Sequence, residues 1–468
     1  MKLKREINWC EPFDLAGRLA HRPGFAFLDS ALRHPELGRY SFIGIEPFGS
    51  FTYKFGRATW NNIDLPEPPL EALRRLLAQF VFETDPSLPP FQGGAIGAVP
   101  YEFGWELEGL RSPAHRGNGT LDPLHFSFYD LVFAFDLLER RVFIVSSGFP
   151  EIDPERRPER AMARLDYALS LVEAAPANPS ARQTAVQGFE SNFTQAGYHA
   201  AIERVRTHIF DGDIYQANIA QRFVAAPPAD FSPFAFYGQL RSANPAPYAG
   251  FLRCGNATIA SSSPELLLRK RGTRVEARPI KGTIARAAGE AEDAEARRSL
   301  LASEKDRAEN IMIVDLLRND LSRVCRPFSV DVPIVCGLET YGNVHHLVSV
   351  IKGELTDEKD CLDLLAAAFP GGSVTGAPKR RAMEIIEAVE GVPRGYYCGS
   401  IGFIGFDGTM DLNIAIRTAI LRQDEPMGEA SFHAGGGITC LSDPQAEYEE
   451  THAKVKRIFA AFQDHEPQ

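Results

Sequence analysis

The chain has 468 residues, which is enough for one large folded unit or for two or three domains. Charged residues make up 24% and hydrophobic residues 44%, as in an ordinary globular protein. The formal net charge of −11 argues against non-specific nucleic-acid binding, which needs a positive field. It does not exclude an anionic substrate, because local groups shape the field of a site.

The cysteines and the first residues bear on the cellular compartment. The 7 cysteines are scattered and none forms a CxxC pair, which favours free thiols over a disulfide framework or a zinc site. Residues 1–11 carry charge without an apolar core, so we expect no signal peptide. No stretch approaches the roughly 18 to 20 apolar residues of a membrane span. The sequence therefore predicts a cytoplasmic protein.

The composition changes twice along the chain. Residues 1–173 mix short β-like runs with Gly and Pro turns and end in a charged helical stretch. Residues 174–190 begin with Ala, Pro, Ser, Gln and Asn and few large apolar residues, which is typical of a linker. Helix and strand signals then alternate through residues 191–462, with no strict helix between successive strands. We expect an α+β protein with much antiparallel sheet.

Two expected helices each carry a pair of acidic side chains on one face. The first helix follows Ser303 and the second follows Asp443-Pro444, and both starts are good caps. The pairs are spaced three residues apart: Asp306 with Glu309, and Glu447 with Glu450. Two such helices could hold Mg²⁺, which prefers oxygen ligands and keeps several waters. Each pair also has a purely structural explanation, since Asp306 can complete a capping box and Glu450 can pair with Lys454.

Two glycine-rich segments could approach a ligand closely. The segment 369–379 precedes an expected helix, whose N-terminus would expose backbone N–H groups to an anion. It lacks the Gly-Lys-Ser/Thr ending of a nucleotide-binding loop. The cluster Gly435-Gly-Gly437 follows an expected strand and allows close backbone approach. Plain turns would explain both segments as well.

Two basic residues stand in apolar surroundings. Arg417 lies in the β-like run 414–421, and a buried arginine needs a planar carboxylate from either a ligand or the protein. Lys281 lies 16 residues after Glu265, in the turn-like segment 278–283. Partial burial would lower the pKa of Lys281 and make it a nucleophile or base, whereas a solvated lysine would have no such role.

Taken together, these motifs resemble the chorismate-utilising enzymes, a family that includes anthranilate, aminodeoxychorismate, isochorismate and salicylate synthases. The resemblance spans about residues 193–459, and the motifs stand in the family's order. They are Ser263-Pro-Glu265, Pro279-Ile-Lys-Gly-Thr283, Asp306-Arg-Ala-Glu-Asn310, His346-Leu-Val-Ser349, Gly376-Ala-Pro-Lys379, Ile416-Arg417, Gly435-Gly-Gly437 and Glu447-Tyr-Glu-Glu450.

The N-terminal region resembles the aminating branch of the same family. Its motifs are Phe27-Leu-Asp-Ser30, Arg39-Tyr-Ser41 and Pro90-Phe-Gln-Gly-Gly94. In that branch such segments form a tryptophan pocket, which is regulatory in some members and merely structural in others. The resemblance also implies the fold, in which both sequence regions build one large two-sheet antiparallel β sandwich with flanking helices.

The resemblance implies roles for individual residues. Magnesium would bind the ring carboxylate of chorismate, with Glu309 and Glu450 as direct ligands and Asp306 and Glu447 assisting through water. The substrate-binding residues would be Tyr397 and Arg417 at the side-chain carboxylate, with Gly436 and Gly437 nearby, and His346 and Ser373 around the C4 hydroxyl and the ring. The family often has Thr where this chain has Ser373.

One position separates the branches of the family. Anthranilate synthases have a small residue where Lys281 stands, whereas aminodeoxychorismate synthases have lysine. In that branch the lysine amine adds at C2 and the C4 hydroxyl leaves, and ammonia then attacks C4 and releases the lysine. Glu265 is placed to protonate the departing hydroxyl. The hydroxylating members have a lysine base where this chain has Gln216, which argues against isochorismate or salicylate formation.

The resemblance thus predicts component I of an aminodeoxychorismate synthase, a transferase that makes 4-amino-4-deoxychorismate for 4-aminobenzoate and folate. The chain has no Gly-x-Cys-x-Gly nucleophile turn, so we expect ammonia from a separate glutaminase subunit. No nucleic-acid or membrane partner is expected. Two alternatives are anthranilate synthase component I and a catalytically inactive scaffold or tryptophan-sensing subunit. The second is disfavoured because every proposed catalytic position keeps a competent residue.

Overall fold

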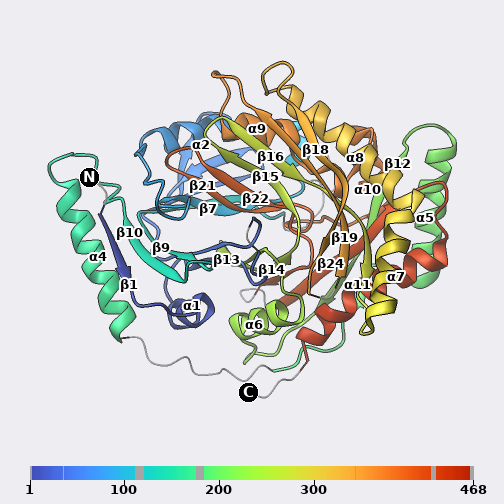
Figure 1. Cartoon of the computed structure of the whole chain (residues 1–468), viewed down its shortest axis with the longest axis horizontal. Coiled ribbons are helices and arrows are strands. Elements are labelled where there is room, and N and C mark those ends of the chain that lie inside the picture. The colour runs from blue at the N-terminus through green and yellow to red at the C-terminus, as the bar shows by residue number, and fades with distance from the viewer. Residues whose placement is uncertain are drawn as a thin grey trace.

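A computed structural model of the chain describes residues 3–34, 36–110, 121–174, 184–342, 344–422 and 428–463. Two large antiparallel sheets with flanking helices make up the structure (Figure 1), which confirms the predicted fold class. Most of the predicted linker, residues 175–183, lies outside the described residues. None of the described helices is both long and apolar enough to span a membrane.

The first sheet contains 12 strands within the described residues. In spatial order they are β1 (Leu3–Ile7), β10 (Arg141–Ser146), β9 (Leu131–Asp136), β3 (Tyr40–Gly44), β2 (Ala26–Asp29), β13 (Tyr248–Cys254), β14 (Ala257–Ser263), β23 (Thr418–Arg422), β24 (Glu429–Ile438), β12 (Gln216–Ala225) and β11 (Glu190–Ser191), with β20 (Gly376–Ala377) also paired to β12.

The second sheet also contains 12 strands within the described residues. They are β17 (Ile280–Ala285), β19 (Val344–Glu354), β16 (Arg274–Arg278), β15 (Leu266–Arg271), β22 (Met410–Asn413), β21 (Ser400–Gly405), β7 (Gly94–Val99), β8 (Leu124–Tyr129), β4 (Gly49–Lys54), β5 (Arg57–Trp60) and β6 (Ile63–Leu65), with β18 (Asp331–Thr340) also paired to β19.

Helices cover the outer faces of both sheets. The described helices are α1 (Pro12–Leu19), α2 (Pro69–Ala78), α3 (Phe103–Leu107), α4 (Arg157–Ala174), α5 (Gln195–Phe210), α6 (Pro233–Ala243), α7 (Glu290–Ala302), α8 (Glu304–Ser322), α9 (Cys361–Ala368), α10 (Lys379–Glu390) and α11 (Pro444–Ala461). Helices α4, α6 and α11 pack on the first sheet, and α2, α7 and α8 pack on the second. Central strands such as β7 and β9 are therefore buried along their whole length.

Each sheet runs without a break from strands of the first predicted sequence region to strands of the second, and the two sets meet at one strand pair. In the first sheet β2 pairs with β13, so that Phe27 lies opposite Phe251. In the second sheet β7 pairs with β21, so that Gly97 lies opposite Gly402. Apolar side chains form large buried clusters between the sheets and on their outer faces. These clusters contain residues from both early and late parts of the chain. The two regions therefore share their hydrophobic cores.

Candidate active site

The two acidic helices begin where their caps predict. The Ser303 hydroxyl accepts a hydrogen bond from the backbone N–H of Asp306 (3.3 Å) at the start of α8. The Asp443 carboxylate accepts one from the N–H of Ala446 (2.9 Å) at the start of α11, with Pro444 in the first turn. These caps fix the first turns of both helices, which carry the predicted metal-binding residues.

Lys281 on β17 lies between these helices and the glycine cluster of β24. Its Nζ is 3.9 Å from Oε2 of Glu309 on α8. A Cβ atom added to Gly437 would lie 3.1 Å from the Lys281 Nζ. A Cβ added to Gly436 would lie 3.2 Å from Oε2 of Glu447 and 3.8 Å from Oε1 of Glu450. The glycines thus let strand β24 approach the charged groups closely, and a plain turn does not explain them.

Two further lysines face the acidic side chains of α8 and α11. Lys305 Nζ is 3.5 Å from Oε1 of Glu447, and Lys454 Nζ is 2.7 Å from Oε1 of Glu450. Burial disfavours the charge on Lys305, but Glu447, Glu309 and Glu450 outweigh it and raise the pKa of its ammonium. One ammonium thus feels three carboxylates from two helices, so the cluster attracts cations.

The donor set of this cluster fits a hard divalent cation. All its ligating atoms are carboxylate oxygens, which Mg²⁺ prefers, and one or two direct protein ligands suffice for that ion. Asp306 lies against the segment that carries Lys281, since a Cβ on Gly282 would be 2.9 Å from the Asp306 Cβ. Within the described residues, no three His, Cys, Asp or Glu side chains are arranged to hold a metal by themselves. Substrate and water oxygens would have to complete the coordination.

The surroundings of Lys281 favour its neutral amine. Its side chain is only 11% exposed, so a solvated surface lysine does not describe it. Burial lowers the pKa of Lys281 below its ordinary value, Glu309 opposes this shift, and the charge of Lys454 adds to it. Burial likewise raises the pKa of the Glu309 carboxyl.

Glu265 is a buried acid that holds its proton near neutral pH. Its side chain accepts hydrogen bonds from the Ser373 hydroxyl (2.7 Å) and from the backbone N–H of Ile280 (3.2 Å). Burial raises the pKa of Glu265 to about 7, and these two hydrogen bonds only partly offset that effect. The second bond ties Glu265 to the residue next to Lys281. A carboxyl with this pKa can donate or accept a proton at physiological pH.

Arg417 and Tyr397 lie on two segments joined by a backbone hydrogen bond, which the Cys398 N–H donates to the Ala415 carbonyl (2.9 Å). Arg417 has a left-handed backbone (φ 52°), and burial lowers the pKa of its guanidinium to about 10. Among the described residues, no carboxylate forms an ion pair with Arg417, so a protein acid does not occupy its planar fork. Tyr397 is buried and stacks on His433 with ring centroids 4.8 Å apart.

His346 presents an imidazole to the same region as Lys281. Its Nδ1 shares a hydrogen bond with the Thr283 hydroxyl (2.7 Å), two residues from Lys281. Burial lowers the pKa of His346 to about 3, so the ring is neutral. Its buried Nε2 has no hydrogen-bond partner in the described structure. A ligand hydroxyl could supply that partner.

The structure adds residues that sequence patterns did not assign to the site. From the sequence, Lys454 could be assigned only as a partner of Glu450 four residues away, and Lys305 only as a charged residue near the start of a helix. Gln216, which the family resemblance had already placed at the position of a lysine base, is buried, and neither atom of its amide has a partner within the described structure. A Cβ on Gly437 would be 2.2 Å from its Nε2, so Gln216 lines the same space as Lys281.

A cavity of about 530 Å³ lies elsewhere in the molecule. Its lining includes residues of the N-terminal motifs, among them Leu28, Ser30, Tyr40 and Gln92. None of the predicted catalytic or metal-binding residues lines it. The tryptophan pocket implied by these motifs stays a prediction. Lys281 is not among the residues that line this cavity.

The fold and the site identify the class of protein. Residues 28–460 match the family model for chorismate binding enzymes, so the chain belongs to the chorismate-binding enzyme family. Aminodeoxychorismate synthase component 1 of Salmonella typhimurium is 40% identical over 450 residues, or 94% of this chain and 93% of that protein. Anthranilate synthase component 1 of Thermus thermophilus is 36% identical over 449 residues, or 95% and 94%.

Solved structures agree with this assignment. The crystal structure of anthranilate synthase component I from Streptococcus pneumoniae matches with a TM-score of 0.80 at 32% identity, covering 91% of this chain and 93% of that one. The menaquinone-specific isochorismate synthase of Escherichia coli shares the fold with a TM-score of 0.73 at 18% identity. The predicted family and fold are therefore confirmed.

Proposed function

We propose that this chain is the chorismate-aminating component of an aminodeoxychorismate synthase. Relatives named for this activity and relatives named for anthranilate synthesis have similar identities, so overall similarity does not select the branch. The observation that carries the proposal is Lys281. It is a buried amine with a lowered pKa, between the acidic helices and the proton-holding Glu265.

The first half of the reaction uses Lys281 and Glu265. The neutral Lys281 amine adds to C2 of chorismate, the ring double bonds shift, and the C4–O bond breaks. Glu265 gives its proton to the departing hydroxyl, which leaves as water. The Ser373 hydroxyl and the Ile280 N–H hold the Glu265 carboxyl in place for this transfer. The nitrogen of Lys281 loses one proton in forming the C2–N bond, and the ionised Glu265 carboxylate takes up that proton, which restores the acid.

The second half replaces Lys281 by ammonia. Ammonia adds at C4, the double bonds shift back, and the C2–N bond to Lys281 breaks. One proton of the added ammonia passes to the departing lysine nitrogen, so that Lys281 leaves as a neutral amine and C4 carries an amino group. The net change is chorismate plus ammonia to 4-amino-4-deoxychorismate plus water. We expect ammonia from the glutaminase component of the same enzyme, since the relatives are named as component 1 of their synthases.

The remaining residues bind and orient the substrate. Arg417, which has no carboxylate partner among the described residues, would bind the side-chain carboxylate of chorismate through two parallel hydrogen bonds. Tyr397 would assist at the same carboxylate, and His346 Nε2 would contact the C4 hydroxyl. Glu309 and Glu450 would hold Mg²⁺, with Asp306 and Glu447 in support. The ion would neutralise the ring carboxylate as a Lewis acid.

Product analysis tests the branch directly. Purified enzyme should be incubated with chorismate, Mg²⁺ and an ammonium salt, and the products separated with and without added aminodeoxychorismate lyase. We expect a product that the lyase converts to 4-aminobenzoate. If fluorescent anthranilate accumulates instead, the anthranilate synthase alternative holds and Lys281 does not direct the chemistry. If purified, folded enzyme leaves chorismate unchanged, the inactive-scaffold alternative holds.

A further inference from the structure

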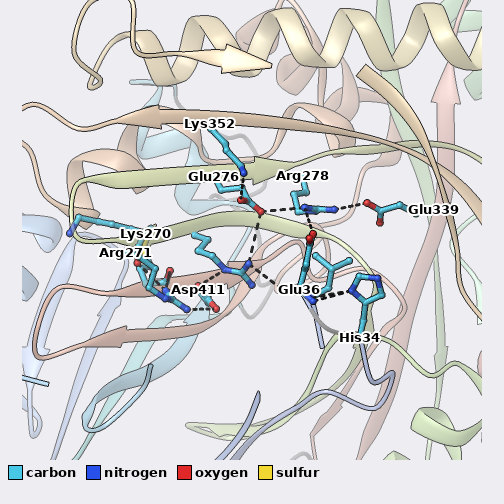
Figure 2. A network of polar contacts seen from close by, with 12 residues as sticks. His34, Glu36, Lys270, Arg271, Glu276, Arg278, Glu339, Lys352 and Asp411 are labelled. Carbon is cyan, nitrogen blue, oxygen red and sulfur yellow. Dashed lines mark hydrogen bonds and ion pairs between the residues drawn. The ribbon is translucent and has the colours of Figure 1, made fainter. Parts of the chain in front are cut away.

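Arg278 is a buried cation just before the segment that carries Lys281. It is the last residue of β16, three positions before Lys281, and is 7% exposed. Figure 2 shows its guanidinium reaching Glu339, to which Nη2 donates a hydrogen bond. Glu339 lies on β18, which pairs with β19 on the edge opposite β16. Nη1 also lies 3.5 Å from Oε1 of Glu276 and 3.9 Å from Oε2 of Glu36. Carboxylates thus contact the guanidinium of Arg278 on several sides.

The contacts of Arg278 continue into the active site. The second oxygen of Glu339 accepts a hydrogen bond from the Tyr341 hydroxyl (2.8 Å). The Tyr341 ring packs edge-on against His346, with ring centroids 5.3 Å apart. His346 in turn shares its Nδ1 with the Thr283 hydroxyl (2.7 Å). One chain of contacts therefore links Arg278 to Thr283, on either side of Lys281.

Lys281 itself lies where the strand pairing is interrupted. Ile280 lies opposite Val348 of β19, but Thr283 lies opposite His346, so β17 has one extra residue in between. Gly282 in this bulge has φ 87°, which a residue with a Cβ rarely adopts. A bulge locally disrupts the ladder and re-aims a side chain. The direction of the Lys281 side chain therefore depends on the anchors that flank the bulge.

The anchors on the near side of the bulge are few. The Pro279 carbonyl accepts a hydrogen bond from the Ser349 N–H (3.2 Å), and the Ile280 N–H donates to Glu265. Arg278 is the charged member of this group. Its guanidinium contacts Glu339, and Glu339 is connected through Tyr341 and His346 to Thr283 on the other side of the bulge. Loss of the guanidinium would remove the cation from the Glu339 carboxylate, whereas Glu276 would keep Arg269 and Lys352 nearby.

We propose that Arg278 is a positioning residue for Lys281. The ion pair of Arg278 with Glu339 holds the bulge in the shape that directs the Lys281 amine into the site. The inference rests on the proposed function, because it takes Lys281 as the nucleophile. Arg278 has no direct contact with the carboxylate cluster or with Arg417 in the described structure. Its loss should therefore affect the reaction rate more than substrate binding.

Three variants test this inference: Arg278→Lys, Glu339→Gln and the control Arg274→Lys, an exposed arginine on the same strand. Arg278→Lys keeps the charge but loses the planar fork. We expect its kcat to fall about tenfold or more, as for a small misplacement of a reacting group. The KM for chorismate should stay within about twofold, because uniform binding is untouched. Arg274→Lys should match the wild type in both kcat and the KM for chorismate.

A single-turnover measurement separates positioning from folding. Enzyme is mixed with chorismate without ammonia, quenched, and the adduct on the Lys281 peptide is measured by mass spectrometry over time. In Arg278→Lys the final amount of adduct should equal that of the wild type, and its rate of formation should fall with kcat. Glu339→Gln should show the same pattern, and the double variant should be no slower than the slower single variant.

The outcomes discriminate clearly. A normal adduct rate in both single variants would overturn the inference, as would a reduced adduct amount with an unchanged rate, which is the mark of partial unfolding. If Arg278→Lys does not fold, Glu339→Gln alone decides by the same two criteria. If the wild-type enzyme turns over without any Lys281 adduct, the proposed function fails. The inference then falls with it, whereas a wild-type adduct that also forms at the normal rate in both variants overturns the inference alone.

Discussion

Replacing Glu265 by glutamine should stabilise the protein above pH 7 while slowing its chemistry. Burial raises the pKa of the folded-state carboxyl to about 7 from its ordinary 4.5. The unfolded chain therefore releases this proton at a lower pH than the folded protein does. The contribution of the Glu265 carboxyl to stability is thus fully present below the unfolded-state pKa and is lost as the pH rises towards about 7. Glutamine carries no charge and keeps an oxygen for the Ser373 and Ile280 donors.

The size of the effect follows from the pKa difference. A separation of about 2.5 pH units at about 1.4 kcal/mol each gives ~3 kcal/mol of instability in the wild type at pH 8. At pH 5 the same linkage gives only about 1 kcal/mol. Glu265→Gln should be more stable than wild type by these amounts. Without the proton donor, formation of the Lys281 adduct should slow roughly 10²- to 10⁴-fold.

Urea denaturation at pH 5 and pH 8 provides the measurement, with the exposed Glu358→Gln as the matched control. Quenched single-turnover reactions give the adduct rate. The reasoning about Glu265 would be refuted by a variant no more stable than wild type at pH 8, or by an equal gain at both pH values. A normal adduct rate would remove Glu265 from the chemistry.

Four further substitutions test other parts of the site and fold. Lys281→Ala should abolish the adduct and most aminodeoxychorismate formation. If chromatography shows an unchanged rate of aminodeoxychorismate formation, the assignment to the aminodeoxychorismate synthase branch is wrong. Glu309→Gln should leave the fold intact, as judged by circular dichroism, and weaken Mg²⁺ binding by calorimetry; normal turnover at low Mg²⁺ would contradict the metal assignment. Arg417→Lys should weaken chorismate binding by about 1 to 3 kcal/mol, and an unchanged KM would indicate a structural role. Lys379→Met should destabilise the protein by about 1 to 3 kcal/mol in urea, because Asp320 loses a buried partner 2.8 Å away and keeps only the half-exposed Arg323 as a cation. Adding Asp320→Asn should restore part of this loss.

Local chemistry made parts of this site predictable from sequence. Ser303 and Asp443 cap their helices through hydrogen bonds to N–H groups three residues away, so the starts of α8 and α11 follow from a few neighbouring residues. The three-residue spacing of the acidic pairs then places them on one face of each helix. Arg417 was similarly predictable as an arginine in need of a ligand or an acid, since its neighbours are apolar.

Other features depend on contacts between distant residues. Local propensity does not determine that Phe27 lies opposite Phe251, because strand pairing is set by packing across the whole sheet. The bulge at Lys281 exists because β17 and β19 differ by one residue between two paired positions. The sequence likewise did not indicate that Lys305 reaches Glu447 on another helix. Each of these required the three-dimensional arrangement.

The pairing of early strands with late strands at one seam in each sheet constrains how this protein can change over evolution. A chain divided between α4 and β11 would give two pieces, each with unpaired strand edges at β2 and β7 or at β13 and β21. Such edges attract other chains when left bare. The cavity is lined by strands from both sides of the seam in the first sheet, so neither piece carries it alone. The cavity and the strand that carries Lys281 must therefore be inherited together.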